Sequence, residues 1–391
     1  VVTDEQDRQP TNDMAELLRL HYQYGHVSMR KIQEMATQGI LQHAQHVCLY
    51  AKATRRPWRN KTSKNYDDNK PTKSGQVVSV DQLVSPTPGL IAQMTGFLTT
   101  KRYKYATVYV DHYSRYGFIY LQKTSTGQKT VEGKQAFESM ARRMGIKIEN
   151  YHADNGIFKA HEWVTACKNE GQGLSFASVN AHHQNGMAER QIRYLQDLAR
   201  TMLIHASKRW PDSVTANLWP YAMRMAQEAI NNTPSLQDMQ RRCPIELFSG
   251  SKVVSNPKHW KPFGCPVYVL TNDLQQGNPY HKWKERSKVG VYLGTSPIHS
   301  KNVALVLDRQ TAHVSPSFHV KFDSTFDTTK EITSKSQWQI KAGFVAQRET
   351  KQVTPSERLQ RLRPTVTPNS VPEGATMTSS RKRRERTSTI E

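Results

Sequence analysis

The stretch Asn180-Ala181-His182-His183-Gln184-Asn185-Gly186-Met187-Ala188-Glu189-Arg190-Gln191 decides how the rest of the chain is interpreted. Asn185-Gly186 is a typical turn dipeptide, and the residues that follow repeat at helical spacing. The apolar positions of this repeat are Ile192, Leu195, Ala199, Met202, Leu203 and Ala206. The opposite face carries Glu189, Arg193, Gln196 and Arg200. Such a face suits contact with a metal ion and phosphate groups, although an ordinary solvated helix face has the same pattern.

The charge of the chain favours a polyanionic partner. Its 391 residues, enough for two or three domains, include 55 Lys and Arg against 33 Asp and Glu, a net charge of +22. More than half of the excess lies in residues 241–391, which carry 25 basic and 12 acidic residues. This distribution indicates a basic module or arm near the C-terminus, and a basic tail that only improves solubility is the alternative.

The cysteines and the hydropathy indicate a chain from a reducing compartment without membrane contact. The four cysteines, Cys48, Cys167, Cys243 and Cys265, are too few and too scattered for a disulfide framework. No apolar run is long enough to span a membrane, and no signal peptide opens the sequence. The first residue is Val rather than Met, which fits a segment of a longer product.

Residues 1–51 predict a small helical module, with a helical pattern from Met14 to Gln42. His21, His26 and Cys48 have the side chains that tetrahedral zinc prefers. Ala51 occupies the position that would complete a Cys-x2-Cys pair, so the zinc pattern is degenerate. Zinc binding and a module held by its own core are therefore both open. Residues 52–75 form a polar, basic linker.

Residues 76–240 predict an α/β core. Strand-like runs cover 76–83, 104–111, 117–121, 146–151 and 174–179, and helical patterns cover about 130–144, 162–170, 189–206 and 212–232. The order is three strands, helix, strand, helix, strand, helix. It predicts a mixed sheet whose first three strands form an antiparallel meander.

The C-terminal part divides into two regions. Residues 241–327 contain a connecting segment and then short strand-like runs at 267–270, 287–293, 303–307 and 312–322, which predict a small β module. Residues 328–391 are polar and predict a disordered basic tail. Its block Arg381–Arg386 fits a nuclear localisation signal or a DNA contact, and a solvated tail is the alternative.

Three carboxylates fall at the ends of neighbouring predicted elements. Asp81 lies near the end of the first strand, Asp154 follows the fourth, and Glu189 begins the helix after the fifth. Ligand sites in α/β sheets form at such edges, and gathered carboxylates suit Mg²⁺ or Mn²⁺. Two such ions could activate a water or a 3′-hydroxyl for attack on a phosphodiester. Asp111, at the end of a neighbouring strand, competes with Asp81 for this role.

The motifs resemble the integrases of copia-type long-terminal-repeat retrotransposons. The resemblance is carried by Gln-Asn-Gly-Met-Ala-Glu189-Arg, Val-Asp81-Gln-Leu, Tyr-Val-Asp111-His-Tyr-Ser-Arg-Tyr and Asp154-Asn-Gly. Downstream pieces in the same order include Pro262-Phe-Gly-Cys265-Pro-Val-Tyr, Gly290-Val-Tyr-Leu-Gly294 and Val320-Lys-Phe-Asp323. His21, His26 and Cys48 match the family's N-terminal zinc module, so the resemblance covers about residues 15–327.

The resemblance implies a ribonuclease-H-like catalytic core, with Asp81, Asp154 and Glu189 as ligands of Mg²⁺ or Mn²⁺. The implied activity is polynucleotidyl transfer, which joins the 3′ ends of element DNA to host DNA. Double-stranded DNA and further copies of the chain are the implied partners. The implied location of the protein is the nucleus, where it acts on chromosomal DNA, after an earlier stage in a cytoplasmic particle. We expect Arg190, Arg193, Gln196 and Arg200 to contact the DNA.

Two alternatives to an active integrase remain. An inactive or domesticated relative would bind DNA without chemistry, and Ala51 favours it, whereas the intact set of three acids argues against it. A ribonuclease-H-like nuclease would cut without joining, and the basic C-terminal third argues against this reading.

Overall fold

The computed structural model describes residues 13–37, 71–91, 99–177, 185–236, 238–253, 259–278 and 282–345. All of them belong to one compact unit, Val1–Ala346. Its helices are α1 (Asp13–Gln23), α2 (Met29–Thr37), α3 (Gly127–Arg143), α4 (His161–Asn169), α5 (Gly186–Arg209), α6 (Trp219–Asn231), α7 (Pro244–Ser249), α8 (Asn272–Gln275) and α9 (Trp338–Lys341). Its strands are β1 (Val78–Gly89), β2 (Tyr103–Asp111), β3 (Gly117–Gln122), β4 (Asn150–Ala153), β5 (Gly173–Phe176), β6 (Pro266–Leu270), β7 (Ser287–Thr295), β8 (Ala304–Asp308), β9 (Val314–Ser317) and β10 (Val320–Phe322).

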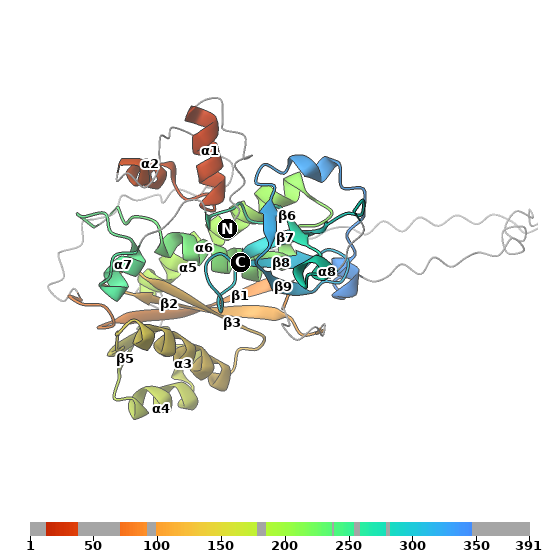
Figure 1. The fold of residues 1–391 in the computed structure, drawn as a ribbon. Helices are drawn as coiled ribbons and strands as arrows, with labels where there is room; N and C mark the ends of the chain where they lie inside the picture. The colour runs from red at the N-terminus through yellow and green to blue at the C-terminus, as the bar shows by residue number, and fades with distance from the viewer. Residues whose placement is uncertain are drawn as a thin grey trace, which may run out of the picture. The chain divides into compact units, whose positions relative to one another are not determined.

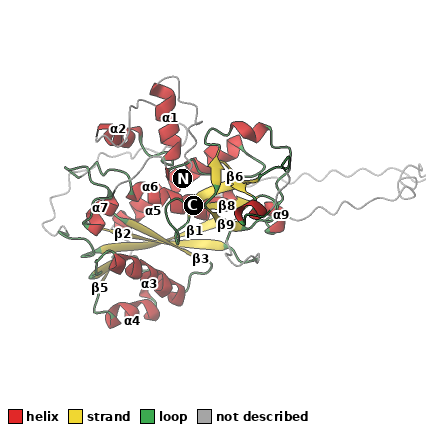
Figure 2. Cartoon of the chain, in the orientation of Figure 1, coloured by secondary structure: helices red, strands yellow, loops and turns green. Residues whose placement is uncertain are grey.

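The first sheet has the strand order β3-β2-β1-β4-β5. Strands β1, β2 and β3 pair antiparallel, whereas β4 pairs parallel with both β1 and β5. The predicted mixed α/β sheet with an antiparallel meander is therefore confirmed. Helices α3 and α4 lie on one side of this sheet, and α5 and α6 lie on the other (Figure 1, Figure 2).

Alternating side chains give each face of the sheet its own core. On one face, Val80 of β1 and Tyr109 of β2 pack in a cluster that includes Phe137 of α3. On the other face, Leu83 and Val108 pack in the cluster that includes the buried residues of α5 and α6. Side chains alternate along a strand, so Val78 and Val80 point to the face that α3 covers. Asp81 and Leu83 point to the face that α5 and α6 cover.

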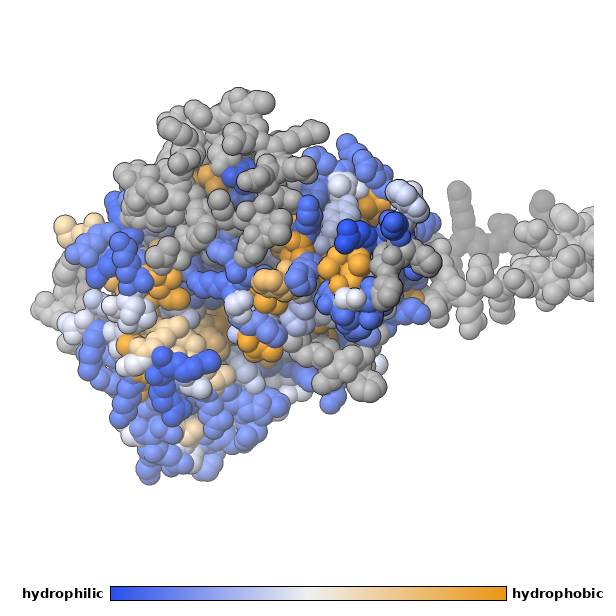
Figure 3. All heavy atoms as spheres, viewed as in Figure 1, coloured by the Kyte–Doolittle hydropathy of each residue, from blue (hydrophilic) through white to orange (hydrophobic). Residues whose placement is uncertain are grey.

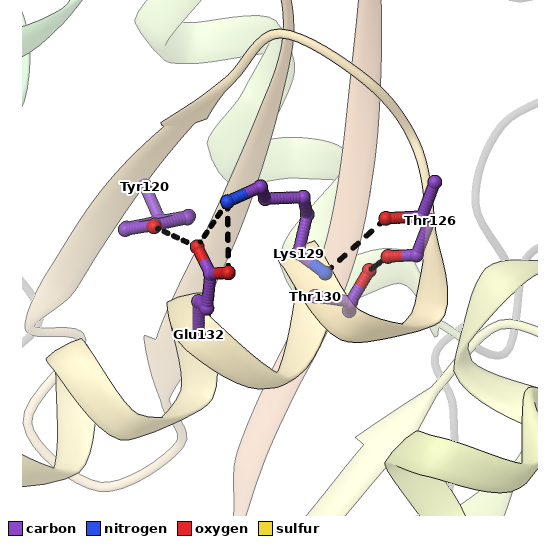
Figure 4. Close-up of polar contacts among 5 residues, drawn as sticks. All are labelled: Tyr120, Thr126, Lys129, Thr130 and Glu132. Atoms are coloured by element: carbon purple, nitrogen blue, oxygen red, sulfur yellow. Dashed lines mark hydrogen bonds and ion pairs between the residues drawn. The ribbon is translucent and has the colours of Figure 1, made fainter.

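Helix α3 is fixed to the sheet at its first turns (Figure 4). The hydroxyl of Thr126 accepts a hydrogen bond from the backbone N–H of Lys129, which caps the helix and stabilises it by about 1 kcal/mol. Lys129 also pairs with Glu132 at 2.7 Å, and the hydroxyl of Tyr120 in β3 donates to the same carboxylate at 3.3 Å. The pair therefore links the helix to the strand beneath it.

The second sheet has the order β10-β6-β7-β8-β9, and all its pairs are antiparallel. Strands β6, β7 and β8 overlap the runs predicted at 267–270, 287–293 and 303–307, whereas the single run predicted at 312–322 is divided into β9 and β10. Buried Val267 and Tyr292 of this sheet belong to the same hydrophobic cluster as Leu195 of α5 and Trp219 of α6. The second sheet thus shares a core with the helices that cover the first.

The N-terminal helical pattern is interrupted, contrary to the continuous helical run predicted from Met14 to Gln42. Helix α1 ends at Gln23 and α2 begins at Met29, because Gly25 and His26 have left-handed φ values of 66° and 62°. The two helices pack through Leu20, Tyr24, Val27, Ile32 and Met35, together with Ala229 and Trp260. This small cluster joins the helical pair to α6.

Three element boundaries also differ from the predictions. Strand β1 continues to Gly89, through Pro86 and Pro88 and a shift of its register with β2 between Val84 and Gly89, and β4 begins only at Asn150. Helix α6 begins at Trp219 after turns and a short 3-10 segment, although its apolar pattern predicts a start near residue 212. Residues 178–184, Cys48, Ala51, most of the predicted linker and the predicted tail with Arg381–Arg386 lie outside the described residues.

Most of the described surface in Figure 3 is hydrophilic. No helix among the described residues is long and apolar enough to cross a membrane.

Candidate functional site

The register of the first sheet brings two of the predicted acids to neighbouring positions. Val80 of β1 is paired with Ala153 of the parallel strand β4. Asp81 and Asp154 each follow directly after one of these paired residues. Adjacent strands are about 5 Å apart. Val80 and Ala153 both lie in the core beneath α3, so alternation directs Asp81 and Asp154 to the face that α5 covers.

The third acid follows from an anchor at the start of α5. The side-chain amide of Asn185 donates a hydrogen bond of 3.0 Å to the backbone carbonyl of Val80, immediately before Asp81. Asn185 is 2 % exposed and makes no capping bond to its own helix. Glu189 lies four residues later, about 6 Å along the helix axis. The anchor therefore holds the first turn of α5, which carries Glu189, against β1 next to Asp81.

The residues at this edge have the oxygen ligands that a hard cation such as Mg²⁺ prefers. Asp81, Asp154 and Glu189 are carboxylates in half-buried positions, and the buried Oδ1 of Asn185 makes no hydrogen bond. Among the described residues, however, no three His, Cys, Asp or Glu side chains are close enough together to hold a metal ion. The backbone thus brings oxygen donors of the right type to one edge, while their side chains form no closed ligand set.

Asp111 has a different environment from Asp81. It is completely buried, and its carboxylate accepts hydrogen bonds from the backbone N–H groups of Gly75 and Ser114 and from the Ser114 hydroxyl, at 2.6–2.8 Å. Burial raises the pKa of Asp111, and these hydrogen bonds counteract the rise. The carboxylate therefore closes the turn between β2 and β3.

The predicted DNA-contact residues lie along α5. Arg190, Arg193 and Arg200 are exposed, and Gln196 is half-buried. The guanidinium of Arg200 pairs with Asp197 at 2.8 Å, so its charge is partly balanced within the helix. Arg193 follows Glu189 by one turn and is the better placed of the two for a phosphate near the acids.

The N-terminal histidines are close to each other. His21 Nε2 and His26 Nδ1 are 3.0 Å apart, and His21 Nδ1 lies 3.1 Å from the carbonyl of Val27. Two converging imidazoles suit zinc, but the third predicted ligand, Cys48, lies outside the described residues. Zinc binding by this module stays a prediction.

Sequence reasoning missed two residues that shape the region. Asn185 was read only as part of a turn, although its amide fixes α5 to β1. His205 of α5 stacks on Tyr22 of α1 with ring centroids 4.3 Å apart, and it thereby joins the helical pair to the core. Neither partner is near in sequence, so no local pattern could have revealed these contacts.

The cavity with a volume of about 320 Å³ lies elsewhere, on the second sheet. It is lined by residues of β6, β7, β8 and β9, among them Lys288, Asp308 and His313. None of the predicted site residues lines this cavity. It is therefore separate from the acidic edge, the edge of the first sheet where Asp81 and Asp154 lie.

Comparison with known proteins gives sequence relatives. The chain is 29 % identical over 231 residues to a retrovirus-related Pol polyprotein from transposon RE1 of Arabidopsis thaliana, which covers 58 % of the chain and 14 % of that protein. It is also 29 % identical over 250 residues to that from transposon RE2 of the same plant, covering 62 % of the chain and 16 % of the relative. The chain is a relative of retrotransposon Pol polyproteins. The predicted resemblance to copia-type elements is therefore confirmed.

The match covers a small part of each relative, so the relatives' names do not assign an activity to this segment. The chain spans about a seventh of the RE1 polyprotein. No protein-family model matches the chain.

Solved structures also align with the chain. The catalytic core domain of the HTLV-2 integrase, in complex with magnesium, aligns with 45 % of the chain and 98 % of that domain, with a TM-score of 0.32 and 16 % identity. A chain of a simian T-cell lymphotropic virus intasome in complex with the PP2A regulatory subunit B56 gamma also aligns. The alignment covers 68 % of the present chain and 84 % of that chain, with a TM-score of 0.37 and 15 % identity. These similarities are too weak to add to the argument from strand order and register.

Proposed function

We propose that this chain is a retrotransposon integrase, which joins the 3′ ends of element DNA to host DNA by divalent-metal-dependent polynucleotidyl transfer. The observation that carries the proposal is the meeting of Asp81, Asp154 and the anchored start of α5 at one edge of the sheet. Kinship with retrotransposon Pol polyproteins supports the choice of DNA as substrate.

In this proposal, Asp81, Asp154 and Glu189 would hold Mg²⁺ or Mn²⁺. Bound divalent cations supply Lewis acidity that favours attack by a hydroxyl and stabilises the oxygen that leaves the phosphodiester. The chain's own residues bring the DNA to this edge. Arg190 and Arg193 bind phosphates without reading sequence, and Gln196 contacts the DNA one turn beyond Arg193.

The remaining parts of the proposal concern the rest of the chain and its partners. His21, His26 and Cys48 would hold zinc in the N-terminal module. Double-stranded DNA is the substrate, several copies of the chain act together, and the reaction takes place in the nucleus.

The test is a joining assay with purified protein, a duplex that represents an element end, and a supercoiled target plasmid. We expect joined products with Mg²⁺ or Mn²⁺, and no products with EDTA. Cutting of the plasmid without joining would favour the nuclease reading. DNA binding without either product would favour an inactive relative, the second candidate, which Ala51 at the degenerate zinc pattern favours.

A further inference from the structure

Two arginines from distant segments meet beside the acidic edge. Arg115 lies in the turn between β2 and β3, and Arg190 lies in the first turns of α5. The guanidinium of Arg115 contacts the sulfur of Met187, three residues before Arg190. The turn and the helix are therefore in direct contact where the two guanidinium groups lie.

The backbone holds Arg115 in an uncommon conformation. Its φ value is 64°, in the left-handed region that side chains other than glycine, Asn and Asp seldom adopt. The turn is closed on both sides, because the N–H of Arg115 donates to the carbonyl of Asp111 and the N–H of Asp111 donates to the carbonyl of Tyr116. Residues fixed in this region concentrate at functional sites, and a glycine here would remove the strain.

The charge of neither arginine is neutralised by an ion pair with a described residue. Asp111, the acid nearest in sequence, is buried and already accepts hydrogen bonds from Gly75 and Ser114. Burial lowers the pKa of Arg115, the positive charge of Arg190 lowers it further, and the carboxylate of Asp111 offsets part of this decrease. Two close cations, one of them partly desolvated, favour an anion between them.

The position of the pair relative to the acids suits a DNA strand. His112, three residues before Arg115, contacts the hydroxyl of Ser79 at 2.7 Å, and Ser79 lies two residues before Asp81 on the same face of β1. Two residues of a strand span about 7 Å. The arginines thus approach the sheet beside the acids, on the face that α5 covers.

We propose that Arg115 and Arg190 together bind one phosphate of the DNA strand whose end reaches Asp81 and Asp154. Arg115 is then a DNA-positioning residue supplied by the β2–β3 turn. The inference rests on the proposed function for its ligand, a duplex DNA end, and it adds a residue that the sequence did not single out for binding.

The test measures binding of the full chain to a labelled duplex end in EDTA, over a series of salt concentrations. Arg115→Gly removes the guanidinium and fits the left-handed backbone. We expect about a tenfold loss of affinity near 0.1 M salt, and a plot of log K against log[salt] that is shallower by about 0.9, the slope of one phosphate contact. Arg115→Lys restores the charge and should restore the slope.

Two further variants keep the result interpretable. Arg143→Ala removes an exposed cation from the end of α3, on the other side of the sheet, and should leave the slope unchanged. Arg190→Gln should lower the slope as Arg115→Gly does, and the double variant should lose little more than either single variant, because both side chains bind the same phosphate.

Several outcomes would overturn the inference. These are a normal slope for Arg115→Gly, a slope that Arg115→Lys does not restore, full additivity in the double variant, and a wild-type chain that does not bind DNA. The binding assay contains no metal, so its result is separate from the joining assay. A chain that joins DNA while Arg115→Gly binds normally would refute the phosphate site and leave the proposed function intact.

Discussion

Position in the sheet gives two aspartates of neighbouring strands different chemistry. Asp81 follows Val80 at the edge where β4 also ends, and its side chain is half-buried on the face that α5 covers. Asp111 is buried and surrounded by N–H and O–H donors that fold the β2–β3 turn. Composition and spacing could not separate the two, because the difference depends on the strand to which each is adjacent.

Asn185 offers a prediction at the scale of one residue. Asn185→Ala removes the buried hydrogen bond to Val80 and leaves that carbonyl without its partner. We expect a loss of about 1–3 kcal/mol in the free energy of unfolding, measured by urea denaturation. Asn217→Ala, which removes an exposed bond to the carbonyl of Pro88, should cost clearly less. Equal costs would show that the α5 anchor has no special weight.

At the scale of elements, helix α3 contains a buried ion pair. Lys134 Nζ lies 3.0 Å from the carboxylate of Glu138, and the two side chains are 2 % and 9 % exposed. The same carboxylate accepts hydrogen bonds from the hydroxyl of Tyr151 and the amide of Gln172. Helix α3 is therefore joined to β4, and to the segment before β5, by a polar network inside an apolar core.

Loss of one partner of this network should be costly. Lys134→Met leaves Glu138 as a buried charge without its cation, and we expect a destabilisation of about 3–5 kcal/mol. Lys129→Met breaks a partly exposed pair on the same helix and should cost only about 0.2–0.5 kcal/mol. Thermal denaturation of the two variants measures the contrast, and similar melting temperatures would contradict it.

The elements themselves were largely predictable from local patterns. The strand-like runs Lys104–Asp111 and Gly117–Leu121 predict β2 and β3 within one residue at either end. The break at Gly25 was missed, because a left-handed turn does not disturb the apolar spacing around it. The parallel pairing of β1 with β4, and the anchor of α5, depend on contacts between residues 73 and 105 positions apart, which no local pattern encodes.

At the scale of the whole described unit, the helical pair and the second sheet both pack on α5 and α6. His205 lies between Tyr22, His26 and Phe326, which come from the two ends of this unit. Burial, followed by the charges of Arg209 and His21, lowers the pKa of His205 to about 3. His205 is therefore neutral in the folded chain at neutral pH.

This histidine gives the unit a stability that depends on pH. Between about pH 6.5 and 3 the unfolded chain binds a proton that folded His205 does not, so stability falls as the pH decreases through this range. His205→Phe keeps the ring contacts and should reduce the difference in melting temperature between pH 7.5 and 5. His161→Phe, on the surface of α4, serves as the control. An unchanged pH dependence in His205→Phe would contradict the role of His205.

The joining assay with Glu189→Gln tests the central claim most directly. Glu162→Gln, an exposed acid at the start of α4 on the other side of the sheet, is the matched control. We predict that Glu189→Gln lowers the rate of joining by about a hundredfold or more at unchanged DNA affinity, while Glu162→Gln joins normally. Full joining by Glu189→Gln would contradict the account.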